Sequence, residues 1–246
     1  VAISRDEKLV AGASRNGRLR VWDVATGMVR KGFKLSETDD KTGTPAYYAD
    51  NFGLAFCPSD QHLAGCFCGQ VYVWNAKSGD LVTSFSVATS GPSPIVFSPD
   101  GSHLVVGGEA IHVWKMDAGK QIAKIPAPNG EEIDSLAFRR DGAVLATIAT
   151  GSSTVYLWDF KNQKLTAELE RGTTVYDVDF SPDGQRMATA CKDNSIRLWD
   201  TTKQNQVAVL RGHDDYVHAV AFSSDGNMLA SASGDTTIRI WEAVPA

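Results

Sequence analysis

The sequence predicts an all-β fold made of about six copies of one unit, and three observations carry this prediction. Apolar and polar residues alternate over short segments such as 217–222, as in half-buried strands. Turn-forming residues, mainly Asp and Gly, separate these segments. Six tryptophans recur, each after an apolar anchor: Ile3, Phe56, Phe97, Phe138, Phe180 and Phe222. Successive anchors are 53, 41, 41, 42 and 42 residues apart, and a period of about 40–45 residues is typical of β-propellers.

Within each unit we expect four strands, with the tryptophan near the end of the third. The turns between the first and second strands read 5–7 (RDE), 58–60 (PSD), 99–101 (PDG), 140–142 (RDG), 182–184 (PDG) and 224–226 (SDG). Proline fixes φ in such turns, and glycine accepts a positive φ. The segments 28–34, 81–87, 121–125, 165–169 and 206–210 are the candidate fourth strands.

The segment 212–241, GHDDYVHAVAFSSDGNMLASASGDTTIRIW, contains the complete pattern: an initial Gly-His, the turn SDG, the turn GD and a final Trp. It resembles a WD repeat, the unit of the WD-type β-propeller. The resemblance covers nearly the whole chain and implies one propeller domain over 1–246. Its repeats would lie at 1–34, 52–87, 93–125, 134–170, 176–211 and 218–246, with a loop insertion over 35–51.

The first and last repeats are incomplete, because the first lacks the start of its first strand and the last lacks its fourth strand. We expect either a fragment, for example of a seven-bladed ring, or a six-bladed ring with an incomplete closing blade.

Two interpretations compete for His213, Ser231 and Asp235. These residue types compose a hydrolytic triad, but Ser231 would lie in the middle of a strand, away from a nucleophile elbow. The resemblance instead implies a structural tetrad of His213, Ser231, Asp235 and Trp241, which locks the blade. The fifth repeat would keep Thr189, Asp193 and Trp199 of this tetrad without a histidine, so we expect Asp193 to be partly solvated.

Several classes of function find no support in the composition. The net charge of −5 lacks the basic footprint of a nucleic-acid binder, and the apolar runs are too short to span a membrane. No metal-ligand spacing, phosphate-binding loop or paired-carboxylate motif is present, so we expect no metal, no cofactor and no enzymatic activity. The four irregularly spaced cysteines favour a reducing, cytoplasmic compartment.

The resemblance also implies where a protein or peptide partner would dock, on one rim of the propeller. Positions four and six residues before each anchor contribute to this rim, together with the residue before a turn aspartate. The candidate partner-binding residues are Arg15, Asp50, Phe52, Glu132, Asp134, Tyr176, Lys192, Tyr216 and His218. Aromatic residues among charges are typical of interface hot spots, although a solvated rim with scattered aromatics is the alternative.

The leading prediction is a non-catalytic scaffold or adaptor that presents a rigid surface for protein–protein interaction. One alternative is a regulatory or spacer propeller in a larger multidomain enzyme, such as a kinase or protease, which would make other domains of the same chain its partners. A propeller-borne hydrolase is the other alternative. The scaffold and spacer predictions rest on the resemblance to the family. Fold alone does not determine function.

Overall fold

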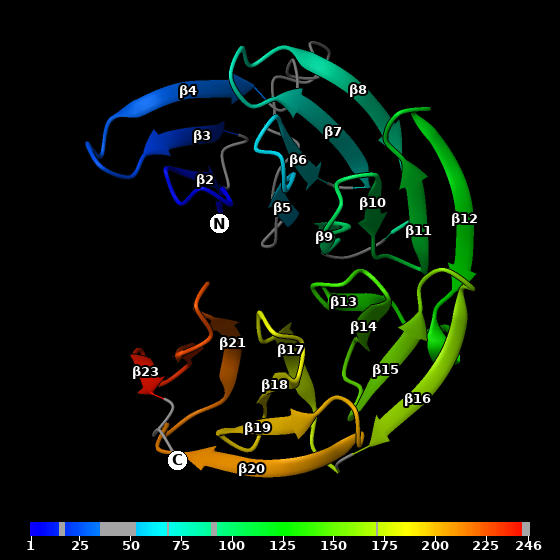
Figure 1. Cartoon of the computed structure of the whole chain (residues 1–246), viewed down its shortest axis with the longest axis vertical. Coiled ribbons are helices and arrows are strands. Elements are labelled where there is room, and N and C mark those ends of the chain that lie inside the picture. The colour runs from blue at the N-terminus through cyan, green and yellow to red at the C-terminus, as the bar shows by residue number, and fades with distance from the viewer. Residues whose placement is uncertain (15–17, 35–52, 68, 90–92, 171, 243–246) are drawn as a thin grey trace, which may run out of the picture. The chain divides into compact units, whose positions relative to one another are not determined.

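The computed structural model of the protein describes residues 1–14, 18–34, 53–67, 69–89, 93–170 and 172–242. The chain divides into two compact units, unit 1 (Val1–Pro126) and unit 2 (Ala127–Ala246). Each unit contains three antiparallel sheets, drawn in Figure 1, which we call blades 1–3 and blades 4–6. Within each unit the first strands lie at the narrow side of a fan, and the fourth strands lie on its outside.

All three blades of unit 1 have four strands in chain order. Blade 1 contains β1 (Ala2–Ile3), β2 (Leu9–Ser14), β3 (Arg18–Asp23) and β4 (Val29–Lys34). Blade 2 contains β5 (Gly53–Phe56), β6 (His62–Phe67), β7 (Gln70–Asn75) and β8 (Leu81–Ser86). Blade 3 contains β9 (Ile95–Phe97), β10 (His103–Val106), β11 (Ala110–Lys115) and β12 (Lys120–Pro126).

Unit 2 begins with a short 3-10 helix, η1 (Pro128–Gly130), and continues with blades of the same topology. Blade 4 contains β13 (Ile133–Phe138), β14 (Val144–Ala149), β15 (Thr154–Asp159) and β16 (Lys164–Glu170). Blade 5 contains β17 (Val175–Phe180), β18 (Arg186–Cys191), β19 (Ser195–Asp200) and β20 (Asn205–Arg211). Blade 6 has three strands among the described residues: β21 (Val217–Phe222), β22 (Met228–Ser233) and β23 (Ile238–Glu242).

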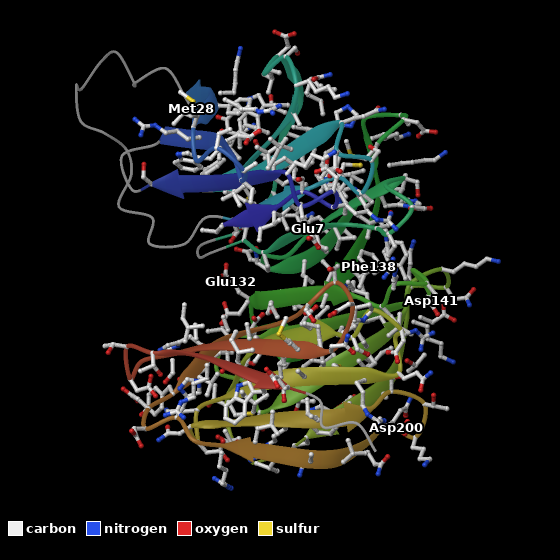
Figure 2. All side chains as sticks on the ribbon, turned by 60° about the vertical axis from the view of Figure 1, so that its left-hand side comes forward. Glu7, Met28, Glu132, Phe138, Asp141 and Asp200 are labelled. Carbon is white, nitrogen blue, oxygen red and sulfur yellow. The ribbon has the colours of Figure 1, made fainter. Side chains whose placement is uncertain are left out.

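The prediction of an all-β fold of propeller blades is confirmed, with four strands in blades 1–5 and three in blade 6 among the described residues. All five candidate fourth strands are present as β4, β8, β12, β16 and β20, with bounds shifted by at most one residue. In Figure 2, Glu132 lies at one end of β13, and Asp141, in the turn after β13, lies at the other. The two ends of a blade therefore present different loops to solvent.

The turn between the first and second strands holds one residue at positive φ in every blade. The residue is glycine in blades 3–6, for example Gly101 at 72° and Gly226 at 75°. In blades 1 and 2 it is Glu7 at 59° and Asp60 at 55°. In blades 1, 3, 5 and 6 a serine two residues before the turn aspartate donates a hydrogen bond to its carboxylate, as from Ser181 Oγ to Asp183 Oδ1 at 2.6 Å.

The apolar core consists of layers between neighbouring blades. The layer between blades 4 and 5 joins Ile148 and Val155 to Met187 and Trp199. The tryptophan of each later blade within a unit packs toward the preceding blade, because Trp199 belongs to this layer and Trp241 packs against buried residues of blade 5. Each fully buried apolar side chain contributes about 1.5–3 kcal/mol, so a blade depends on its neighbour for stability.

Backbone contacts also join neighbouring blades in unit 1. The Asp60 carboxylate of blade 2 accepts hydrogen bonds from the backbone N–H groups of Arg5 (2.8 Å) and Asp6 (3.1 Å) in the turn of blade 1. At the start of blade 2, a Cβ on Gly53 would lie 2.2 Å from the carbonyl oxygen of Ser93. Only glycine allows this approach.

The two non-glycine turn residues give a matched pair of substitutions. We expect Glu7→Gly to raise the free energy of unfolding by roughly 0.5–1 kcal/mol, because it removes the cost of a side chain at positive φ, partly offset by greater freedom in the unfolded chain. Asp60→Gly also relieves its φ but loses the two hydrogen bonds to blade 1, so we expect no gain. Urea unfolding of both variants checks this expectation, and stabilisation by Asp60→Gly equal to that by Glu7→Gly would contradict it.

Candidate functional site

A continuous chain of hydrogen bonds crosses blade 6. His213 lies just before β21, and its Nδ1 lies 2.7 Å from Asp235 Oδ2, while its Nε2 lies 2.7 Å from Ser231 Oγ. Trp241 Nε1 donates to the same hydroxyl at 2.9 Å. The strand register allows this geometry, because Ser231 stands two residues beyond the ladder partner of Trp241, on the same face of the sheet.

Hydrogen bonds hold the Asp235 carboxylate in its ionised form. The Thr237 hydroxyl donates to Oδ1 at 2.7 Å, and the Asp214 N–H donates to Oδ2 at 3.0 Å. These donors, that of Thr237 above all, lower the pKa of Asp235 far below its usual range. The carboxylate therefore fixes the orientation of the His213 ring.

The other blades keep less of this network. Trp158 Nε1 donates to Thr147 Oγ1 at 3.0 Å in blade 4, and Trp199 Nε1 donates to Thr189 Oγ1 at 3.1 Å in blade 5. In blade 3 the register places Val106 at the hydroxyl position, and Trp114 Nε1 is buried without a hydrogen-bond partner. The tryptophan N–H of blade 3 is therefore left unpaired.

Blade 5 replaces the missing histidine with an arginine. Arg197 Nη2 lies 2.7 Å from Asp193 Oδ2, and the backbone N–H of Ser195 donates to Asp193 Oδ1. The Asp193 side chain is 32% exposed, which confirms the expectation of partial solvation. Its pKa is lowered because hydrogen bonds from Ser195 and Arg197 outweigh burial. Arg197 was not predicted from the sequence, although its place two residues before Trp199 was a usable signal.

The hydrolytic interpretation of His213, Ser231 and Asp235 fits this geometry poorly. Ser231 is 2% exposed, and its hydroxyl lies between two ring nitrogens, His213 Nε2 and Trp241 Nε1. A nucleophilic serine must face a substrate beside an oxyanion hole. The Ser231 hydroxyl instead connects β22 by hydrogen bonds to Trp241 of β23 and to His213 before β21.

An exposed aromatic cluster lies on the rim of unit 2, across blades 5 and 6. We define it as Tyr176, Tyr216 and His218. The Tyr176 ring centroid lies 6.2 Å from that of Tyr216 and 5.3 Å from that of His218. Tyr216 is 41% exposed, and Lys192 Nζ lies 5.6 Å from the centre of its ring. Four of the predicted partner-binding residues are therefore neighbours.

The loop before β21 fixes the position of this cluster. The N–H of Gly234 donates to the Tyr216 carbonyl at 2.9 Å, and the N–H of Tyr216 donates to Asp215 Oδ1 at 2.7 Å. A Cβ on Gly234 would lie 2.9 Å from Asp215 Oδ2 and 3.4 Å from His218 Nε2. This supporting role of Asp215 and Gly234 could not be predicted from the sequence, because it depends on a close approach between two loops.

The remaining predicted rim residues lie elsewhere or outside the described residues. Glu132 and Asp134 stand at the start of blade 4, where the Thr150 hydroxyl donates to the Glu132 carbonyl at 3.2 Å. Burial, with a smaller contribution from the Glu132 charge, raises the pKa of Asp134. Arg15, Asp50 and Phe52 lie outside the residues that the structure describes.

The described residues contain no group of three or more His, Cys, Asp or Glu side chains arranged to hold a metal ion. Among the same residues, no helix is long and apolar enough to cross a bilayer.

The tetrad gives a graded prediction of stability. We expect Ser231→Ala to lower the free energy of unfolding by roughly 2–4 kcal/mol, because it removes the partner of both His213 Nε2 and Trp241 Nε1, and an unpaired polar group costs about 1–3 kcal/mol. Thr147→Val keeps the side-chain shape and leaves only Trp158 Nε1 without an acceptor. We therefore expect a smaller decrease in the free energy of unfolding, roughly 1–2 kcal/mol. Urea unfolding monitored by circular dichroism measures both decreases in the free energy of unfolding. Equal decreases in the two variants would contradict the prediction.

Comparison with known proteins agrees with the repeat geometry. The family model described as "WD domain, G-beta repeat" matches residues 1–23, 163–200 and 204–242. The latter two matches cover the fourth strand of one blade and the first three strands of the next.

Relatives align over most of the chain. Protein groucho of Drosophila melanogaster is 29% identical over 78% of this chain and 25% of its own length. Periodic tryptophan protein 2 of Arabidopsis thaliana is 26% identical over 87% of this chain and 23% of its own length. WD repeat-containing protein 3 homolog of Dictyostelium discoideum is 27% identical over 74% of this chain and 20% of its own length. The chain therefore spans about a quarter or less of the length of these relatives. The three segments that the family model matches are WD repeats.

Proposed function

We propose that the chain is a non-catalytic scaffold that binds a protein or peptide through the aromatic cluster on the rim of unit 2. One observation carries the proposal: three aromatic rings from two different blades gather at the surface, with Tyr216 41% exposed. Aromatic side chains dominate the hot spots of protein interfaces, where they bury large areas at low cost in conformational entropy. The loop contacts of Asp215 and Gly234 hold the cluster in place before a partner arrives.

The charges around the cluster favour a partner segment with basic and apolar side chains. Lys192 Nζ already lies 5.6 Å from the Tyr216 ring centre, so this ring accepts a cation over its face. Asp214 and Asp215 immediately precede Tyr216 and are exposed. A lysine or arginine of the partner that took the place of Lys192 would meet the same ring, with these two acidic residues in the same loop.

Paired substitutions test this site. We expect Tyr176→Ala combined with Tyr216→Ala to reduce capture of bound proteins by about tenfold or more, because truncation of a hot-spot residue typically costs at least about 2 kcal/mol. Affinity capture from a lysate with quantitative mass spectrometry measures the loss, and circular dichroism verifies the fold. The matched control is Met28→Ala with Leu81→Ala, which removes two exposed apolar side chains (70% and 53% exposed) from unit 1.

The effect of removing the Lys192 charge distinguishes specific binding of a basic partner from non-specific binding to an exposed apolar surface. Lys192→Met uncovers the Tyr216 ring and removes a positive charge, so capture of a basic partner should rise. Unchanged capture in the double tyrosine variant, or equal loss in the control, would reject the site.

Two further proposals concern the setting of the chain. The relatives are four to five times longer than the matched region, which supports a role as one module of a larger protein. Cys57 and Cys191 are free and buried thiols, which supports a reducing, cytoplasmic compartment.

A further inference from the structure

Two carboxylates of β17 lie in the apolar layer between blades 5 and 6. Asp177 and Asp179 pair across the ladder with Ala190 and Ala188, so their side chains lie on the same face of blade 5 as these alanines. Both alanines are fully buried and belong to the layer that packs against Val220 of blade 6. The two aspartates are only partly exposed. Charged groups are therefore placed where the rest of the layer is apolar.

Each carboxylate accepts a hydrogen bond from the edge of the neighbouring blade. Asp177 Oδ2 accepts the backbone N–H of Val220 at 3.0 Å, and Asp179 Oδ2 accepts that of Phe222 at 2.7 Å. β21 is the edge strand of its sheet, so amides that face away from β22 have no ladder partner. Asp177 Oδ1 also accepts the Ser135 hydroxyl of blade 4 at 2.8 Å. The carboxylates thus connect the first strands of all three blades of unit 2.

No cation balances these two charges among the described residues of the strands packed against β17. Those strands are β13, β14, β18 and β21, and their titratable side chains are Asp134, Arg186, Cys191 and His218. Arg186 Nη1 lies 3.4 Å from Asp200, His218 lies against Tyr176, Asp134 lies beside Thr150, and Cys191 contacts Thr189. None of them donates a hydrogen bond to Asp177 or Asp179.

Burial without a counter-ion favours the protonated acid. Burial is the largest cause and raises the pKa of both groups against the pull of the N–H donors. Repulsion by Asp177 adds to the effect at Asp179, whose pKa rises to about 7.

We propose that Asp177 and Asp179 form a proton-dependent latch, which holds β21 against blade 5 more tightly when protonated than when ionised. The sign follows from linkage. A carboxyl with a raised pKa in the docked state binds a proton that the open, hydrated state releases. The stabilisation is complete below the ordinary aspartate pKa of about 4 and is lost as the pH rises through about 7.

The latch and the aromatic cluster involve the same two strands, β17 and β21. Tyr176 precedes Asp177 in β17, and His218 lies two residues before Val220 in β21. Opening between these strands would separate Tyr176 from its two aromatic neighbours. Partner affinity would then fall from mildly acidic to alkaline pH, and this consequence alone rests on the proposed function.

Hydrogen exchange on the 246-residue chain without a partner tests the latch. The measured quantity is the opening constant of the Phe222 and Val220 amides, taken as the exchange rate divided by the intrinsic rate at each pH. For a pKa of about 7 when docked and about 4 when open, we expect the constant to rise about 50-fold between pH 5 and pH 7. A parallel NMR titration of the Asp179 carboxyl carbon should give a midpoint near pH 7.

Isosteric variants separate the latch from general effects of pH. Asp177→Asn with Asp179→Asn keeps side-chain oxygens that accept the amides of β21 but cannot ionise, so its opening constant should vary less than about twofold. Glu168→Gln, at an exposed position on β16, should follow the wild-type curve. A wild-type opening constant that is flat between pH 5 and pH 7, an Asp179 midpoint below pH 5, or an undiminished pH dependence in the double variant would each overturn the proposal. The wild-type measurements decide the question even if the double variant fails to fold.

Discussion

The structure depends on the apolar layer between neighbouring blades. A four-stranded sheet has two faces, and here the fully buried side chains come from both sheets of a pair, as with Ile148 of blade 4 and Trp199 of blade 5. Dispersion and the hydrophobic effect therefore act mainly between repeats, and each repeat is stable only beside another. The tryptophans of blades 2, 3, 5 and 6 belong to these layers or pack against them, and each also carries an N–H group that needs a hydrogen-bond partner.

That one N–H explains how the polar network varies from blade to blade. The Ser231 hydroxyl forms hydrogen bonds with both a tryptophan and a histidine, and the hydroxyls of Thr147 and Thr189 each accept one from a tryptophan. Val106 stands at the same position and can accept none. An apolar residue at this position leaves only the tryptophan N–H unpaired. Burial of the surrounding apolar side chains can offset the free-energy cost of one unpaired donor. If the histidine were kept and the hydroxyl lost, a ring nitrogen of the histidine and that of the tryptophan would both lack a hydrogen-bond partner. Among the described residues, blade 6 keeps both the histidine and the hydroxyl.

The fold could be predicted from the sequence, but only part of the candidate site could. Alternation, turn residues and the tryptophan period are local features, and they located the fourth strands to within one residue. The neighbourhood of Tyr176, Tyr216, His218 and Lys192 followed from positions relative to the strand anchors. Asp215, Gly234 and Arg197 were missed, because their roles depend on contacts between loops or on a substitution within a network. Asp177 and Asp179 resemble the solvent face of an alternating strand, and only the packing of β21 shows that this face is covered.

The carboxylates of Asp60, Asp177 and Asp179 each bind the backbone of an adjacent blade: Asp60 binds a turn of the preceding blade, whereas Asp177 and Asp179 bind the first strand of the next blade. Although the blades share one pattern, they are not interchangeable parts. Moving the fifth repeat to another place in the chain would separate these two acids from the Val220 and Phe222 amides and the Ser135 hydroxyl that bind them. A circular permutation that keeps the order of neighbours preserves every such contact, whereas a shuffle of repeats does not. The order of the repeats is thus itself part of the information that specifies this structure.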